Sequence, residues 1–265
     1  MICSSACGEI VASGDVDAAS DPVADAASDP GGGADAEPAP TADAAGDSAD
    51  AGPDPTLIAR YSLDAVDGQA FPDDSGNGHD AVCVGECPTI GGGVIGGAAS
   101  FGLGPILQVE DSGDFVTPDG FTVSAWVRIR SLTAGAFSVV VSKPFGTGTA
   151  NSWALMMESD GRPTFFSAVN EQDRDFLSGD EPLPLDQYVH LAISWNGAIK
   201  RLYVGGQLIG ARADEILFTM DSVVIGADTD GGTINSRFDG FIDEVRIYGR
   251  TLDDTEIAAL AATQP

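Results

Sequence analysis

The sequence predicts an all-β protein whose antiparallel strands form a sandwich or a barrel, and three observations lead to this prediction. Only 20% of the 265 residues are charged, while glycine occupies 34 positions, a composition typical of strands joined by many turns. Short apolar runs separated by turn residues recur from residue 57 to the C-terminus. A single helix signal is found, and it lies close to the C-terminus.

The clearest strand signal covers residues 121–129, where apolar side chains alternate and share one face: Phe121, Val123, Ala125, Val127 and Ile129. This period of two is typical of a half-buried antiparallel strand. A Gly205-Gly206 pair between two apolar runs predicts a two-residue hairpin turn. Further strands are expected over residues 57–63, 137–142, 153–158, 163–169, 188–195, 201–204, 207–211, 222–226 and 238–248.

The helix signal begins at Asp253, which we expect to be the N-cap, with Glu256 at the third helical position. Ile257 and Leu260 then lie on one apolar face. We expect this short C-terminal helix to cover the sandwich rather than to bind a ligand.

The first 56 residues differ in composition from the rest. They contain ten Asp and two Glu but no Lys or Arg, and from residue 13 onward they are nearly all Ala, Asp, Gly, Pro and Ser. Such a segment has too few large apolar residues to offset the entropy of ordering it. We therefore expect residues 1–56 to be a disordered N-terminal leader and residues 57–265 to be the folded domain.

Cys7 follows Ser5-Ala6, an ending typical of bacterial lipoprotein signals, in which this cysteine is acylated. The basic and apolar regions of such a signal do not precede it. Two interpretations stay open: lipidation of Cys7, with a signal that begins upstream, and a chance match. Lipidation would anchor the chain to the outer surface of the cell.

The chain is strongly acidic, with a formal net charge of −29. Residues 57–265 alone contain 29 acidic side chains against 12 basic ones. Because phosphate binding depends on Lys and Arg, this charge argues against nucleic acid and anionic lipid as partners. The same negative charge favours the binding of divalent cations. No uncharged apolar run reaches the roughly 18–20 residues that span a bilayer, so an integral membrane protein is not expected.

Several motifs follow one another in order along residues 57–265: Asp73-Asp74-Ser75-Gly76-Asn77-Gly78, then residues 96–101, 121–126, 190–195, 202–206 and 238–248. Together they resemble the laminin-G-like jelly-roll domains of the concanavalin A-like lectin and glucanase superfamily. The resemblance implies a two-sheet antiparallel jelly-roll sandwich. Gly102 and Gly205 stand where the family commonly has Asp, and we expect these differences to alter turns rather than the fold.

The resemblance also implies a structural Ca²⁺ ion, with Asp73, Asn77 and Asp243 as ligands and backbone carbonyls supplying further oxygens. Ca²⁺ takes six to eight hard oxygen ligands, which agrees with these residue types. Asp243 is expected to point the same way as Val245 and Ile247. The alternative is a tight turn in which Asp73 caps backbone amides.

Cys83 and Cys87 form a Cys-x₃-Cys pair. A zinc site needs four ligands, and only His79 lies close in the sequence. We therefore expect a small disulfide loop, as suits an exported protein.

The sequence contains no convincing catalytic pair. Glu158 and Asp160 end in an expected turn, whereas Asp243 and Glu244 are adjacent and a strand would send them to opposite faces. No Gly-x-Ser-x-Gly motif is present, and neither His79 nor His190 has a context that suggests a triad. An enzyme is not expected.

We therefore expect a non-catalytic binding module, monomeric and secreted or held at the cell surface. Carbohydrate recognition is favoured, with an extracellular protein ligand as the alternative and glycan hydrolysis as the least favoured function. Two polar loops, residues 170–175 and 228–232, are suited to hydrogen bonding with sugar hydroxyls. An exposed residue that stacks on a sugar is expected, if present, among four aromatic side chains: Trp153, Phe165, Phe166 and Tyr188. No ligand-binding residue is assigned.

Overall fold

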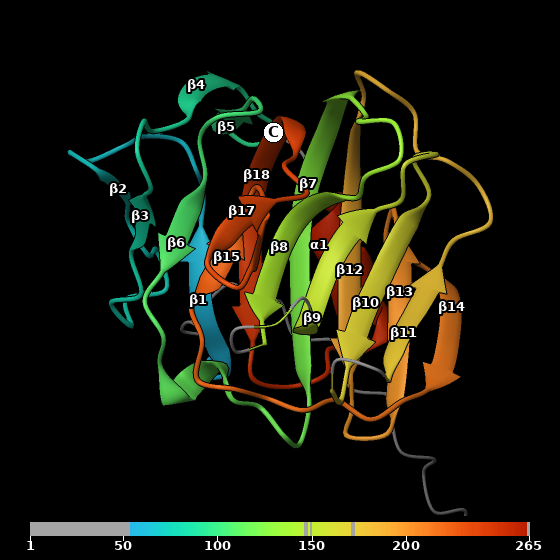
Figure 1. Cartoon of the computed structure of the whole chain (residues 1–265). Helices are drawn as coiled ribbons and strands as arrows, with labels where there is room; N and C mark the ends of the chain where they lie inside the picture. The colour runs from blue at the N-terminus through green and yellow to red at the C-terminus, as the bar shows by residue number, and fades with distance from the viewer. Residues whose placement is uncertain (1–53, 146–147, 149, 171–172, 264–265) are drawn as a thin grey trace, which may run out of the picture. The chain divides into compact units, whose positions relative to one another are not determined.

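The computed structural model describes residues 54–145, 148, 150–170 and 173–263 (Figure 1). Residues 1–53 of the expected leader, with the lipidation candidate Cys7, lie outside the described residues. The described part is built almost entirely of antiparallel strands, with one 3-10 turn, η1 (Gly113–Phe115), and one helix, α1 (Asp254–Ala262).

Most strands belong to two eight-stranded antiparallel sheets. The first sheet has the order β14 (Gln207–Ala213), β13 (Ile199–Val204), β12 (Tyr188–Trp195), β7 (Phe121–Ser131), β18 (Asp239–Tyr248), β5 (Gly97–Phe101) and β4 (Thr89–Gly92), with β1 (Leu57–Tyr61) also paired to β18. The second sheet has the order β11 (Arg174–Ser178), β10 (Pro163–Ala168), β9 (Asn151–Met157), β8 (Ser138–Pro144), β15 (Val223–Ile225), β6 (Leu107–Val109), β3 (Ala81–Cys83) and β2 (Ala70–Phe71). A separate hairpin is formed by β16 (Asp228–Asp230) and β17 (Thr233–Asn235).

The inner faces of the two sheets form the core, and Figure 1 shows the sheets as two layers, with β8–β11 in front of β7, β12 and β13. The alternating side chains of β7 all enter this core, as the sequence predicts. Phe121 illustrates the contact between layers, since its ring centroid lies 5.5 Å from that of Trp153 and 6.0 Å from that of Phe165. The predicted two-sheet antiparallel sandwich is confirmed.

The outer face of the first sheet is covered in part by α1. Ile257 is fully buried against three outward-facing side chains of that sheet, Ala192, Tyr203 and Tyr248. The helix begins as predicted: the Asp253 carboxylate accepts a hydrogen bond from the Glu256 amide (2.9 Å), and Glu256 accepts one from the Asp253 amide (2.8 Å). The expected covering helix is confirmed.

A buried ammonium group joins the two layers at one edge. Lys200 of β13 is fully buried and forms ion pairs with Asp175 of β11 and with Asp214, the latter at 3.1 Å. Its Nζ also donates to the Ser167 hydroxyl of β10 (2.9 Å). Burial lowers the pKa of Lys200, and the two carboxylates oppose that effect. The contacts therefore connect the first sheet to β10 and β11 of the second.

Two strands occur where the sequence predicts polar loops. β11 begins at Arg174, inside the expected loop of residues 170–175, and β16 covers Asp228–Asp230, inside the expected loop of residues 228–232. Both lie at the ends of sheets or in a hairpin, so few of their side chains enter the core and the apolar alternation is missing. By contrast, the Gly205-Gly206 hairpin is confirmed, with φ values of 57° and 78°.

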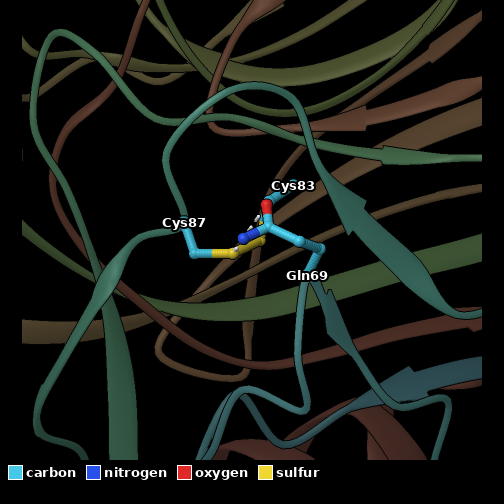
Figure 2. The surroundings of a disulfide bond; sticks show 3 residues. All are labelled: Gln69, Cys83 and Cys87. Atoms are coloured by element: carbon cyan, nitrogen blue, oxygen red, sulfur yellow. Dashed lines mark hydrogen bonds between the residues drawn. A yellow bond between two sulfur atoms is a disulfide. The ribbon is translucent and has the colours of Figure 1, made fainter.

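A disulfide joins Cys83, the last residue of β3, to Cys87, with 5.0 Å between the two Cα atoms. Figure 2 shows Gln69 beside it, and the Gln69 side-chain oxygen lies 3.9 Å from the Cys87 sulfur. The Gln69 carbonyl accepts a hydrogen bond from the Cys83 amide (2.8 Å), which ties the disulfide loop to the segment before β2. The predicted disulfide is therefore present.

Replacing both cysteines (Cys83→Ser with Cys87→Ser) is expected to lower the free energy of unfolding by about 2 kcal/mol, because a five-residue loop is no longer closed in the unfolded chain. Urea denaturation under oxidising conditions measures the difference. A reducing agent should bring the wild type to the stability of the variant and leave the variant unchanged. Equal stability of the two proteins without reductant would contradict the prediction.

Candidate functional site

A groove with a volume of about 160 Å³ lies on the outer face of the second sheet, next to the β16–β17 hairpin. We call it the outer-face groove. It is lined by apolar and polar side chains together: Phe137, Val139, Asn151, Met156, Phe166, Arg174, Phe176, Asp228, Asp230 and Ser236. Strand alternation creates it, because side chains next to core residues in β9 and β10 project to this outer face.

Three phenylalanines form one wall of the groove. Phe166 of β10 and Phe176 of β11 are register partners with ring centroids 4.8 Å apart. Phe137, just before β8, stacks on Phe176 at 5.8 Å with an angle of 23° between the rings. Phe137 and Phe176 are 38% and 39% exposed, whereas Phe166 is 5% exposed. The partly exposed ring of Phe176 therefore packs on the buried ring of Phe166 and on the partly exposed ring of Phe137.

Polar side chains form the floor of the groove. Asn151 of β9 donates from Nδ2 to the Asp228 carboxylate (2.8 Å), which also accepts the Thr229 amide (2.8 Å). The Asp230 carboxylate accepts a hydrogen bond from Asn235 across the hairpin. Burial raises the pKa of Asp228, and the neighbouring Asp230 charge adds to that increase.

The sequence anticipated part of this groove. The two predicted polar loops supply Arg174, Asp228 and Asp230. Phe166, one of the four aromatic residues considered as exposed stacking residues, lines the groove but is only 5% exposed. Trp153 and Phe165, two other candidates, are core residues, and Tyr188 donates from its hydroxyl to the Gly92 carbonyl (2.7 Å) of the first sheet.

Sequence reasoning missed Phe137, Phe176 and Asn151. Phe137 lies in a run that predicts a strand, and Phe176 follows a polar stretch. No local pattern in the sequence indicates that the three side chains share one face.

The carboxylate of Asp73 accepts backbone amides from its own turn and from β1. Its Oδ1 accepts the amides of Arg60 (3.0 Å) and Ser75 (2.9 Å), and its Oδ2 accepts that of His79 (3.1 Å). Asn77 donates to the carbonyls of Leu57 and Ile58 (2.8 and 2.9 Å). These contacts are those of the turn-capping alternative, in which the side chains hold the loop against β1.

Asp243 contacts a different segment, the β4–β5 loop, where its Oδ2 accepts the amides of Val94 (2.7 Å) and Ile95 (3.2 Å). Its Oδ1 is buried and accepts no hydrogen bond from a described residue. Burial raises its pKa to about 6. The contacts of Asp243 and Asp73 thus involve separate loops, and the three-residue calcium site stays a prediction.

The expectation that Asp243 points the same way as Val245 and Ile247 is wrong. A β-bulge lies between Asp243 and Arg246, and Glu244 within it has a φ of 50°. The extra residue reverses the alternation, so Val245 and Ile247 enter the core while Asp243 lies opposite Trp126, outside that core cluster.

No group of three or more His, Cys, Asp or Glu side chains that could hold a metal ion occurs among the described residues. Calcium also binds Asn side chains and backbone carbonyls. Within the described part of the chain, no helix is long and apolar enough to cross a membrane.

Three of the four weak catalytic candidates form structural ion pairs, and Asp243 is the exception. Glu158 and Asp160 both contact Arg162, at 2.8 Å each. Glu244 is buried and accepts hydrogen bonds from Arg60 (2.9 and 3.2 Å) and Arg246 (2.6 Å). Guanidinium groups hold the oxygens of these three carboxylates in fixed positions, which indicates a role in stability rather than in proton transfer.

Each of the two histidines packs against an aromatic side chain. His79 contacts the Asp114 carboxylate at 3.0 Å and packs on Phe115, with ring centroids 4.9 Å apart. His190 is buried against Trp126, with ring centroids 5.4 Å apart, and burial lowers its pKa to about 4. A histidine with this pKa is neutral at physiological pH.

The fold can now be assigned to a class of protein. A laminin-G-like family model, described as the concanavalin A-like lectin/glucanases superfamily, matches residues 102–258. The chain belongs to this superfamily, as the sequence motifs indicate. No curated protein matches the chain.

Solved structures share the fold at low sequence identity. One is domain 4 of AbnA, a GH43 extracellular arabinanase from Geobacillus stearothermophilus, in complex with arabinotriose (TM-score 0.62, 23% identity, 78% of this chain and 98% of that chain). Another is the binding domain of Paraclostridial Mosquitocidal Protein 1 (TM-score 0.63, 16% identity, 78% of this chain and 52% of that chain). A third is a Trypanosoma rangeli sialidase in complex with 2,3-difluoro-KDN (TM-score 0.61, 17% identity, 79% of this chain and 33% of that chain). The chain thus spans about half of the mosquitocidal binding domain and a third of the sialidase.

The raised pKa of Asp243 predicts how stability depends on pH. The native state binds the proton up to about pH 6, whereas an unfolded Asp loses it near 3.8, so the contribution of Asp243 to the free energy of unfolding declines as pH rises from about 4 to about 7. The lowered pKa of His190 makes a contribution of opposite sign over the same range. In chelator-treated buffer, Asp243→Asn should remove roughly 2–3 kcal/mol of this decline.

Urea denaturation across that pH range measures the effect. The exposed Asp180 gives a matched control, and Asp180→Asn should keep the wild-type pH dependence. If the stability of Asp243→Asn depends on pH in the same way as that of the wild type, the assignment of the raised pKa to Asp243 is refuted.

Proposed function

We propose that this chain is a non-catalytic extracellular binding module and that the outer-face groove binds a saccharide. One observation carries the proposal: partly exposed rings of Phe137 and Phe176 lie beside the polar floor of Asn151, Asp228 and Asp230 in a single groove. Sugars present C–H faces that pack on aromatic rings and hydroxyls that hydrogen-bond to such polar groups.

The comparisons support this proposal at the level of the fold. The similar AbnA domain was solved with arabinotriose, and the mosquitocidal structure is a binding domain. The Cys83–Cys87 disulfide agrees with an oxidising, extracellular location. A lipid anchor at Cys7 and a monomeric state belong to the same proposal.

Protein recognition is the second candidate function. The edge strand β14 carries Leu208 and Ile209, which are 43% and 42% exposed. An edge strand with exposed apolar side chains is suited to pairing with a strand of another protein. A protein partner without any glycan signal would favour this function.

Phe176→Ala is expected to weaken saccharide binding about tenfold, because the exposed stacking ring is removed. The full-length chain is first screened on a glycan array that includes arabinotriose, and the affinity of the strongest ligand is then measured by titration calorimetry. Leu208→Ala is the matched control, since it removes an equally exposed apolar side chain on the first sheet. Unchanged affinity in Phe176→Ala would rule out the groove as the binding site.

We also propose a structural Ca²⁺ ion with Asp243 among its ligands. The support is the buried Asp243 Oδ1, which accepts no hydrogen bond from a described residue, and the hard-oxygen chemistry of a carboxylate. Ca²⁺ should raise the melting temperature of the wild type above that in chelator, because it binds only the native state. Asp243→Asn should show no such increase. If the wild type melts at the same temperature in both buffers, the calcium proposal fails.

A further inference from the structure

We propose that the outer-face groove selects uncharged saccharides and rejects saccharides that carry carboxylate or sulfate groups. This inference rests on the proposed function, because it concerns the ligand of the same groove. It follows from the charges and the hydrogen-bonding capacity of the groove floor.

The floor brings three oxygen-bearing side chains together. Asp228 and Asp230 are two residues apart in β16, so both project from the same side of that strand. Asn151 comes from β9 and reaches Asp228 through a 2.8 Å hydrogen bond. All three residues line the groove, so a ligand there meets two carboxylates and a carboxamide oxygen.

Two of these oxygens lack a donor. Asn151 Oδ1 and Asp230 Oδ1 are both buried, and neither accepts a hydrogen bond from a described residue. A buried acceptor without a donor costs free energy, so the floor favours a ligand that brings hydrogen-bond donors and disfavours one that brings further acceptors. Saccharide hydroxyls donate hydrogen bonds. Ionised carboxylate and sulfate groups only accept them, so wherever such a group faces the floor, acceptor meets acceptor.

The charge of the groove also disfavours anionic ligands. Two carboxylates and one guanidinium group, that of Arg174, line it, and the whole chain has a formal net charge of −29. The raised pKa of Asp228 reflects the same environment, in which burial and Asp230 already disfavour a negative charge. An anionic ligand would bring a further negative charge into a partly desolvated space, where like charges repel more strongly than in water.

The test is an array printed with matched neutral and anionic oligosaccharides, probed with the full-length chain at low ionic strength. Lactose, 3′-sialyllactose and 6-sulfolactose share a core, and arabinotriose and trigalacturonic acid extend the comparison. We expect neutral members to bind at least about tenfold more tightly than their anionic counterparts. Added salt should reduce this preference, because it screens the charges.

Asp230→Asn tests the residue assignment, because it removes one charge and keeps the size of the side chain. The ratio of neutral to anionic binding should fall about tenfold in this variant. A purely structural role of Asp230 would weaken both classes of ligand equally and leave the ratio unchanged. The control is Asp180→Asn, which removes an exposed charge outside the groove and should leave the ratio at the wild-type value.

The possible outcomes separate this inference from the proposed function. Anionic saccharides bound as tightly as neutral ones would overturn the inference and leave saccharide binding intact. An unchanged ratio in Asp230→Asn would overturn the role given to the groove floor. A blank array from folded protein would overturn the proposed function, and the inference with it.

Discussion

The alternation of side chains along each strand governs this structure, because every strand presents one face to the core and the other to the outside of a layer. In β10, Phe165 enters the core between the sheets while its neighbour Phe166 lies on the outer face. The first sheet buries part of its outer face under α1. The second sheet has a small apolar cluster there, next to the groove. The candidate site is thus a product of the same periodicity that builds the core.

The same periodicity explains which parts of the fold the sequence predicts. β7 alternates because one of its faces enters the core between the layers, and its prediction as a strand is confirmed. It is not half-buried, however, because Thr122, Ser124 and Trp126 on its other face are buried as well. β11 and β16 lie at a sheet edge and in a hairpin, so they bury few apolar side chains and resemble loops in the sequence. The Asp253 cap and the Gly205-Gly206 turn were predictable because their signals are local.

The candidate site was less predictable because it depends on tertiary contacts. Asp228 and Asp230 form a visible polar motif, but their neighbour Asn151 is 77 residues from Asp228 and has no distinguishing context. Phe137 and Phe176 meet although β9 and β10 separate β8 from β11 in the sheet, and Phe137 lies just before β8 rather than within it. The direction of Asp243 depends on a bulge at Glu244, a residue type that rarely takes a positive φ, so this bulge could not be predicted from the sequence.

Lys200 has a consequence for ligand recognition. It pairs with Asp175, the residue that precedes Phe176 in β11, and Arg212 of β14 donates to the Phe176 carbonyl (2.8 Å). In the unliganded protein, β11, which carries the exposed Phe176 ring, is therefore already held against the first sheet by these contacts. A rigid aromatic wall loses little conformational entropy on binding, so more of the stacking energy appears as affinity. The ion pair of the buried Lys200 ammonium group with Asp175 thus helps to hold in place the strand that carries Phe176, which lines the proposed saccharide groove.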